Sequence, residues 1–237
     1  MTFHSFFKRA ARVLAGWPYK RSYSQSGEDL IVSYLLANVL GIENPSYLDV
    51  GAHHPVFLNN TYLFYARGCR GVCVEPDPQV YEQLRRTRKR DVCLNVGIGR
   101  GPEGFRDFYV FDPSVLSTFS ETERDRHVAL SYKVREVVGV RLVPISSVLS
   151  KYFDPWPTLV SLDTEGLEME ILQSLDFEKH RPEVFCIETA EPATETKVTE
   201  IEAFLSFQGY RVYADTFINT IFVKESSWAM RRKQTDR

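Results

Sequence analysis

Short apolar segments that alternate with helical segments are the feature that most limits the fold of this 237-residue chain. Strands that are apolar along their whole length are typical of a parallel sheet covered by helices on both faces. The last two segments have the pattern of a hairpin. We therefore expect an α/β fold, with a mostly parallel sheet, an antiparallel edge strand and helices on both faces. The expected strands are 47–50, 71–74, 92–98, 105–111, 134–143, 158–162, 184–187, 210–213 and 221–223.

Helical segments separate most of these strands. Ser26 is the expected N-cap of the first helix, with Glu28 and Asp29 in its first turn, and Gly41 ends that helix. The stretch between 111 and 134 is expected to be a polar loop. The expected helices are 30–39, 61–66, 80–88, 144–152, 168–175 and 198–208.

The formal net charge of −2 is unevenly distributed along the chain. Residues 1–21 carry +5 and residues 227–237 carry +3, which leaves −10 on the segment between them. An acidic body is a poor partner for a nucleic-acid backbone and suits a cationic small molecule or a neutral polyol. The basic run 85–90 lies inside this body, and we interpret it as the solvated last turn of a helix rather than a nucleic-acid patch.

We divide the chain into a basic amphipathic extension (1–22), a single domain (23–226) and a basic tail (227–237). Aromatic and aliphatic side chains recur at helical spacing in the extension. Such a helix packs on its own domain or on a partner protein, or it lies on an anionic membrane surface. Disorder of this segment is a third alternative.

Cysteine usage and hydropathy bear on the compartment. The four cysteines lie in or beside apolar strand-like runs and form no C-x-x-C pair, which favours a reduced, cytoplasmic protein. No apolar run approaches the roughly 20 residues that cross a bilayer, and the N-terminus does not have the pattern of a secretory signal. We expect a cytoplasmic protein, with peripheral membrane contact through residues 1–22 as an alternative.

Polar residues follow the expected strands at their carboxyl ends, where ligands bind in sheets of this kind. The first strand ends in Gly51-Ala52-His53-His54-Pro55, and Glu75 follows the second strand. Because Gly51 has no Cβ, a ligand can approach the backbone at this turn. The remaining polar strand ends are Asn95 with Gly97, Asp163 with Glu165, and Glu188.

Gly51 and Glu75 together predict a nucleoside site. A carboxylate at the end of the second strand can accept hydrogen bonds from both hydroxyls of an adenosine ribose, in NAD enzymes and in S-adenosylmethionine (SAM) enzymes alike. The turn after Gly51 lacks the second and third glycines that make room for a pyrophosphate. SAM has no phosphate, and its sulfonium cation suits an acidic rim. The turn therefore favours SAM over a dinucleotide.

Several motifs resemble the FkbM family of SAM-dependent methyltransferases. The resemblance covers roughly residues 23–224 and implies a Rossmann-like class I methyltransferase sheet in the 23–226 domain. It further implies SAM as the methyl donor and O-methylation of a hydroxyl on a sugar, glycan or natural-product type of acceptor. This chain has His53 where many members have Asn. The motifs are Ser24-Gln25-Ser26-Gly27-Glu28-Asp29, Leu48-Asp49-Val50-Gly51-Ala52-His53-His54-Pro55, Asn60-Thr61-Tyr62-Leu63-Phe64-Tyr65, Val74-Glu75-Pro76-Asp77-Pro78 and Asp163-Thr164-Glu165-Gly166-Leu167-Glu168.

A hydroxyl acceptor needs a group that takes its proton. Asp163 is the first candidate, followed by His54 and Glu165, and Glu168 is expected to orient a neighbouring group. We assign no metal ligands, and keep as an alternative that Asp163 and Glu188 hold Mg²⁺ or Ca²⁺. A further alternative is that Asp163 only caps its turn. The expected cofactor-binding residues are Asp49, Gly51, His53, Glu75, Asn95, Val96 and Asp163.

Two other kinds of protein fit parts of this pattern. One is a catalytically silent sheet domain that binds a nucleoside or a partner protein, because a fold does not determine a function. The other is a nucleotide-sugar or NAD enzyme, which the missing glycines disfavour. The expected partner is a small-molecule or glycan hydroxyl acceptor rather than a nucleic acid.

Overall fold

The computed structural model describes residues 20–190 and 196–231. Nearly all of the predicted N-terminal extension and most of the basic tail therefore lie outside the described residues, and the division at 22/23 and 226/227 stays a prediction. Among the described residues, no helix is both long and apolar enough to cross a membrane.

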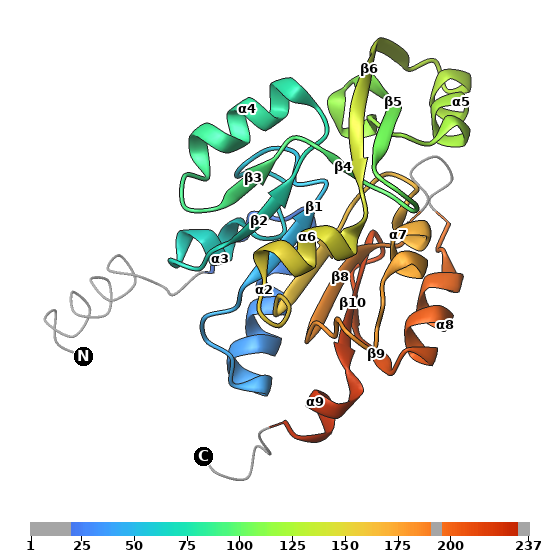
Figure 1. Ribbon diagram of the computed structural model, residues 1–237. Helices are drawn as coiled ribbons and strands as arrows, with labels where there is room; N and C mark the ends of the chain where they lie inside the picture. The colour runs from blue at the N-terminus through green and yellow to red at the C-terminus, as the bar shows by residue number, and fades with distance from the viewer. Residues whose placement is uncertain (1–19, 191–195, 232–237) are drawn as a thin grey trace, which may run out of the picture.

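A seven-stranded sheet with the strand order β3-β2-β1-β7-β8-β10-β9 forms the centre of the molecule (Figure 1). β1 pairs in parallel with β2 and β7, and β7 pairs in parallel with β8, so these four strands end at the same edge. β10 is antiparallel to both of its neighbours. The strands are β1 (Tyr47–Val50), β2 (Gly71–Val74), β3 (Val92–Leu94), β7 (Leu159–Leu162), β8 (Val184–Glu188), β9 (Tyr210–Asp215) and β10 (Asn219–Lys224).

The expected α/β architecture is confirmed, with the antiparallel pair at one edge. The reversed strand is β10, which lies one place in from the edge, while β9 is the outermost strand. The short apolar strands are buried throughout: every residue of β1 and β7 is buried. This is why their sequences show no polar alternation.

Helices cover both faces of the sheet. On one face three helices pack against the strands through Val148, Leu172 and Leu205. On the other face Leu35 and Leu84 pack against the strands. The helices of the first face are α6 (Ile145–Tyr152), α7 (Glu168–Ser174) and α8 (Thr199–Phe207). Those of the second face are α2 (Glu28–Tyr34), which continues as a π-helix (Leu35–Leu40), α3 (Tyr62–Ala66) and α4 (Pro78–Thr87); α9 (Glu225–Ala229) follows β10.

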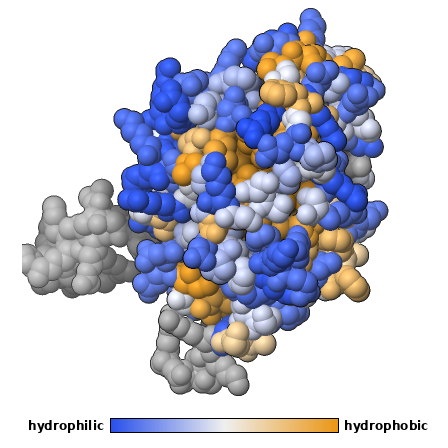
Figure 2. All heavy atoms as spheres, in the orientation of Figure 1, coloured by the Kyte–Doolittle hydropathy of each residue, from blue (hydrophilic) through white to orange (hydrophobic). Residues whose placement is uncertain are grey.

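A second, three-stranded sheet in the order β4-β6-β5 stands beside the main sheet (Figure 1). It contains β4 (Gly97–Ile98), β5 (Gly104–Asp112) and β6 (Lys133–Val143). Between β5 and β6 lie a 3₁₀ helix (Ser114–Leu116) and α5 (Glu121–Ala129). We call residues 104–143 the cap. Figure 2 shows apolar surface over its far end, where the exposed apolar side chains are Val128, Leu130, Tyr132 and Val137.

Two predictions for this region were wrong. The single strand expected at 92–98 is split, because β3 belongs to the main sheet and β4 to the second, three-stranded sheet. At the break the Asn95 amide donates to the carbonyls of Glu75 and Pro76, which turns the chain. The expected polar loop contains α5, whose N-cap Ser120 accepts from the backbone N–H of Glu123 at 3.2 Å.

The start of the first helix also differs from the prediction. Its N-cap is Gly27, at φ 93°, and no side chain caps the helix there. Ser26 instead donates its backbone N–H to Oε2 of Glu28 at 2.8 Å. A left-handed backbone at this position favours glycine over serine. Gly41 ends the π-helix in a left-handed conformation, as expected for the end of the helical segment.

The basic run 85–90 is not uniformly solvated. Arg86 is exposed, but Arg88 has no exposed surface, and its Nε donates to Asp91 at 2.8 Å. Its guanidinium group also donates to the hydroxyls of Tyr47 and Thr61. The predicted solvated turn was therefore wrong for Arg88, which joins α4 to the back of the β1 turn.

Candidate active site

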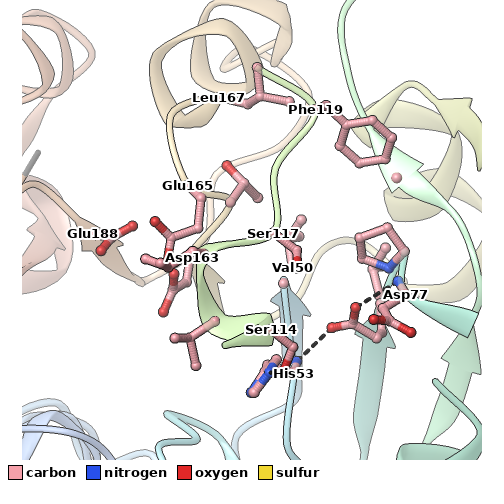
Figure 3. Close-up of a pocket in the computed structure, with 18 of the residues that line it drawn as sticks. Val50, His53, Asp77, Ser114, Ser117, Phe119, Asp163, Glu165, Leu167 and Glu188 are labelled. Atoms are coloured by element: carbon pink, nitrogen blue, oxygen red, sulfur yellow. Dashed lines mark hydrogen bonds between the residues drawn. The ribbon is translucent and has the colours of Figure 1, made fainter. Parts of the chain in front are cut away.

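A cavity of about 550 Å³ opens at the carboxyl ends of β1, β2, β7 and β8 (Figure 3). Its size is within the range of small-molecule sites. The cap forms one wall, through Phe108, Phe119 and residues 114–117. The strand ends contribute Val50, Gly51, His53, Glu75, Pro76, Asp77, Asp163, Thr164, Glu165, Leu167 and Glu188. Gly97 and Ile98 also line it, as do Gln25, Leu58, Ala190, Phe217 and Ile218.

The turn after β1 depends on Gly51. Its φ of 78° is in the left-handed region, and a Cβ atom there would lie 1.7 Å from the backbone oxygen of Asp163. No other residue fits this position without moving the backbone. Because this carbonyl oxygen fills the space of a Cβ, the β1 turn lies directly against the end of β7.

Glu75 connects two loops at the floor of the cavity. Its Oε2 accepts from the backbone N–H of His53 at 2.7 Å, and its Oε1 accepts from that of Asp77 at 2.8 Å. Burial raises the pKa of Glu75 to about 8, although the two amide hydrogen bonds oppose the rise. A carboxylate has about four acceptor sites. Two therefore remain for the hydroxyls of a ligand.

The turn after β7 is capped by Glu168 at the start of α7. Its Oε1 accepts from both the backbone N–H and the hydroxyl of Thr164, at 2.6 and 2.7 Å, and its Oε2 accepts from the N–H of Gly166 at 3.1 Å. Glu168 thus orients this turn. Because Glu168 accepts the hydrogen bonds from these amides, the carboxyl groups of Asp163 and Glu165 are free to face the cavity.

Three carboxyl groups converge at this end of the cavity (Figure 3). One oxygen from each of Asp163, Glu165 and Glu188 lies within 4.8 Å of the others. Burial, with the charges of Glu168 and Asp49, raises the pKa of Asp163 to about 7. Burial and the charge of Asp163 also raise the pKa values of Glu165 and Glu188 well above their usual range. We call these three residues the carboxylate cluster.

Two hydrogen bonds join the cap to the turns after β1 and β7. His53 Nε2 and Ser114 Oγ are 3.0 Å apart, and the hydroxyl of Thr118 donates to the backbone oxygen of Glu165 at 2.8 Å. The second contact holds Glu165 at φ 54°, a left-handed backbone that is uncommon for a non-glycine residue. The cap therefore helps to set the position of the carboxylate cluster.

The structure brings five of the expected site residues to the cavity and leaves four away from its lining. Gly51, His53, Glu75, Asp163 and Glu165 line it, whereas His54, Asp49, Asn95 and Val96 are not among the described lining residues. His54 Nδ1 accepts from the N–H groups of Val56 and Phe57, so this histidine stabilises its own turn.

Asp49 lies on the far side of the β1 turn. Its Oδ2 accepts from the hydroxyl of Thr61 at 2.7 Å and from the amide of Asn59 at 3.3 Å, and Thr61 also contacts Arg88. Burial raises the pKa of Asp49. Asp49 therefore supports the turn from behind instead of lining the cavity.

Some cavity residues were not expected from the sequence. Glu188 was expected as a polar strand end and as an alternative metal ligand, but not among the catalytic or cofactor-binding residues, and no residue of the cap wall was expected in the site. The residues of the cap wall could not be found as polar residues at strand ends, because they come from an insertion between two strands of the main sheet. The capping pattern Ser120-x-x-Glu123 is the signal that could have revealed α5.

Comparison with known proteins establishes the class. The family model of the methyltransferase FkbM domain matches residues 49–212, which is more than half of the chain. The chain therefore belongs to the FkbM family of SAM-dependent methyltransferases, and SAM is its cofactor. The resemblance seen in the sequence motifs is confirmed. No curated protein matches the sequence significantly.

Solved structures of methyltransferases are distantly similar. A TehB-like SAM-dependent methyltransferase from Corynebacterium glutamicum is 8% identical, with a TM-score of 0.44. The alignment covers 93% of this chain and 96% of that protein, and the shares below are given in the same order. A putative caffeoyl-CoA O-methyltransferase from Staphylococcus aureus is 7% identical, with a TM-score of 0.44, over 94% and 93%. The 1,6-didemethyltoxoflavin N1-methyltransferase of Burkholderia thailandensis, solved with S-adenosylhomocysteine, is 12% identical, with a TM-score of 0.41, over 93% and 83%. The family match, rather than these likenesses, establishes the class.

Proposed function

We propose that this methyltransferase transfers the methyl group of SAM to a hydroxyl oxygen of a small-molecule or glycan acceptor. The observation that carries the proposal is the carboxylate cluster, which faces the same cavity as Gly51 and Glu75. Negative charge at this point favours loss of a proton from a bound hydroxyl. The cytoplasmic location that we propose is supported by four free cysteines.

The donor half of the site is formed by the ends of β1 and β2. The two free acceptor sites of Glu75 suit the ribose hydroxyls of SAM. Gly51 and His53 line the cavity at the β1 turn, and we infer that the amino-acid part of SAM lies along this turn. We infer that Pro76, Asp77, Gly97 and Ile98, which also line the cavity, contact adenine.

The acceptor half is formed by the ends of β7 and β8 together with the cap. The acceptor oxygen attacks the methyl carbon of SAM, and the electrons of the carbon–sulfur bond pass to sulfur, which becomes neutral. The hydroxyl proton leaves on the side of the carboxylate cluster. The protein contributes by holding the two reactants in line and by excluding water. We place the loss of the proton at the carboxylate cluster rather than at His54, because Nδ1 of His54 accepts hydrogen bonds from two backbone amides.

Matched acceptors test this proposal. The protein is incubated with SAM and with pairs of compounds that differ only in a hydroxyl or an amine, such as a polyol, a methyl glycoside or a catechol and its amino analogue. Formation of S-adenosylhomocysteine is measured, and the product is identified by NMR. We expect methylation of oxygen in at least one pair. Methylation confined to the amines would contradict the proposal.

Calorimetry with SAM, S-adenosylhomocysteine, NAD and a nucleotide sugar provides the binding control. We expect the first two to bind and the last two not to bind. SAM binding without turnover on any acceptor would favour the catalytically silent alternative.

A further inference from the structure

The carboxylate cluster has no counter-charge among the described residues. Within residues 20–190 and 196–231, no ion pair includes Asp163, Glu165 or Glu188. The charged groups that act most strongly on Glu165 are the carboxylates of Asp163, Glu168 and Glu123. Three half-buried acids thus meet, and the charged groups nearest to Glu165 are carboxylates.

One oxygen of the cluster has no partner of its own. Oε2 of Glu165 is fully buried and has no hydrogen-bond partner among the described residues. Figure 3 shows the Glu165 side chain directed toward Asp163 and Glu188. A buried carboxylate oxygen without a partner is strongly unfavourable unless a proton or a cation occupies the adjacent space. The orphan oxygen therefore points to a ligand at the centre of the cluster.

The local backbone holds this arrangement from both sides. Glu168 takes the amides of Thr164 and Gly166, and Thr118 of the cap holds the carbonyl of Glu165. The three carboxyl groups come from two neighbouring strand ends, since Asp163 and Glu165 follow β7 and Glu188 ends β8. Their convergence is therefore built into the pairing of β7 with β8.

The spacing and the type of ligand fit a hard divalent cation. Mg²⁺ and Ca²⁺ bind carboxylate oxygens at about 2.1 Å and about 2.4 Å, so two ligands of one ion are at most about 4 to 5 Å apart. The oxygens of the cluster lie within 4.8 Å of one another. Three protein ligands leave further coordination positions, and here these positions open toward the cavity.

We propose that Asp163, Glu165 and Glu188 bind one divalent cation, of the Mg²⁺, Mn²⁺ or Ca²⁺ class, and that the acceptor hydroxyl completes its coordination. This inference rests on the proposed O-methylation and explains how the hydroxyl loses its proton. A hydroxyl bound to the cation is acidified, and its proton passes to water before the oxygen attacks the methyl carbon. The acceptors favoured by such a site have two adjacent oxygens that chelate the cation.

Mn²⁺ binding to the full-length protein tests the site directly. The protein is treated with a chelator, dialysed, and titrated with Mn²⁺ in the presence of S-adenosylhomocysteine, by calorimetry and by electron paramagnetic resonance. We expect one Mn²⁺ per chain, displaced by Mg²⁺ or Ca²⁺. Glu165→Gln and Glu188→Gln should each weaken Mn²⁺ binding at least 10-fold. Glu170→Gln is the matched control on α7. Glu170 accepts a hydrogen bond from the backbone N–H of Arg100 and is not among the residues that line the cavity. The Mn²⁺ affinity of this variant should match that of the wild type.

The outcomes separate the two proposals. If S-adenosylhomocysteine binds but the wild type takes up none of Mn²⁺, Mg²⁺ or Ca²⁺ at millimolar concentration, the cation site is wrong and the proposed methylation stands. If Mn²⁺ affinity is unchanged in both Gln variants, the cation binds elsewhere and the site is equally wrong. If the cation binds as expected and only amines are methylated, the site stands and the proposed O-methylation fails. Wild-type stoichiometry decides the question even if a variant does not fold.

Discussion

The α-carbon of Gly51 lies against the backbone carbonyl of Asp163, so that the turn after β1 and the backbone at the end of β7 are in direct contact. We predict that Gly51→Ala lowers the free energy of unfolding by about 2 kcal/mol or more, because it adds a clash at 1.7 Å to the strain of a left-handed backbone. Denaturant unfolding measures this, and SAM affinity should fall as well. Gly68→Ala is the control, since Gly68 has φ 97° but open space around it. Equal losses for the two variants would show that the contact is unimportant.

Glu75 is expected to make SAM binding dependent on pH. With a pKa of about 8 in the empty cavity, Glu75 holds a proton at neutral pH, and it has to lose this proton before both of its free acceptor sites are available to the ribose hydroxyls. We therefore predict that SAM affinity rises with pH between about 6 and about 8 and then levels off. Glu75→Gln should weaken binding by about 1–3 kcal/mol and remove this rise. Calorimetry across this range checks it, with the exposed Glu82→Gln as control. A pH slope that persists in Glu75→Gln would assign it to another group.

The same carboxyl group should make the ligand-free protein less stable in alkali than in weak acid. Its folded pKa of about 8 is above its ordinary value of 4.5. The stabilising contribution is therefore complete below about pH 4.5 and is lost as the pH rises through about 8. Thermal melts should show a smaller decline between pH 5 and 8 for Glu75→Gln than for the wild type. A parallel decline in both proteins would contradict the assignment.

Arg88 is predicted to be a major determinant of stability. Replacing it with Met leaves Asp91 buried without its partner, and the side chains of this pair have no exposed surface. The loss should be about 3–5 kcal/mol. Arg86→Met changes an exposed arginine of the same helix and should stay within about 0.5 kcal/mol of the wild type. Similar unfolding curves for the two variants would mean that the buried network contributes little.

Thr118 is predicted to position Glu165 through the cap. Thr118→Val removes the hydrogen bond to the backbone oxygen of Glu165, so kcat should fall about 10-fold or more while SAM affinity changes little. Thr118→Ser, which keeps the hydroxyl, should recover most of the activity. The exposed Thr122→Val serves as a control. A loss of SAM affinity equal to the loss of kcat would instead indicate a general collapse of the cavity.

The sheet could be predicted from the sequence because fully buried parallel strands have a continuous apolar pattern. β1 and β2 lie at the expected residues. Two residues of the cavity lining followed from the same logic, since Gly51 and Glu75 come directly after these strands. Strand ends therefore identify a site wherever the sheet alone supplies the residues.

The remaining site residues depend on tertiary contacts. Asp49 was expected to bind the cofactor, but its side chain points to Thr61 and Asn59, because alternate residues of a strand face opposite sides of the sheet. His54 was expected as a base, and its role depends on the backbone path of the next three residues. The buried position of Arg88 depends on Asp91 and Tyr47, which no local charge pattern indicates.

The cap is one continuous stretch of chain, residues 104–143, and it meets the strand ends at His53 with Ser114 and at Thr118 with Glu165. In our proposal the turns after β1 and β2 bind the donor, and the cap contacts these turns too, through His53 and through an ion pair of Arg135 with Asp77. Substitutions at the cap residues that line the cavity, such as Phe108 and Phe119, can therefore reshape this wall without changing the residues of the β1 and β2 turns. Because we propose that this wall contacts the acceptor, we expect exchange of residues 104–143 between relatives to change acceptor preference.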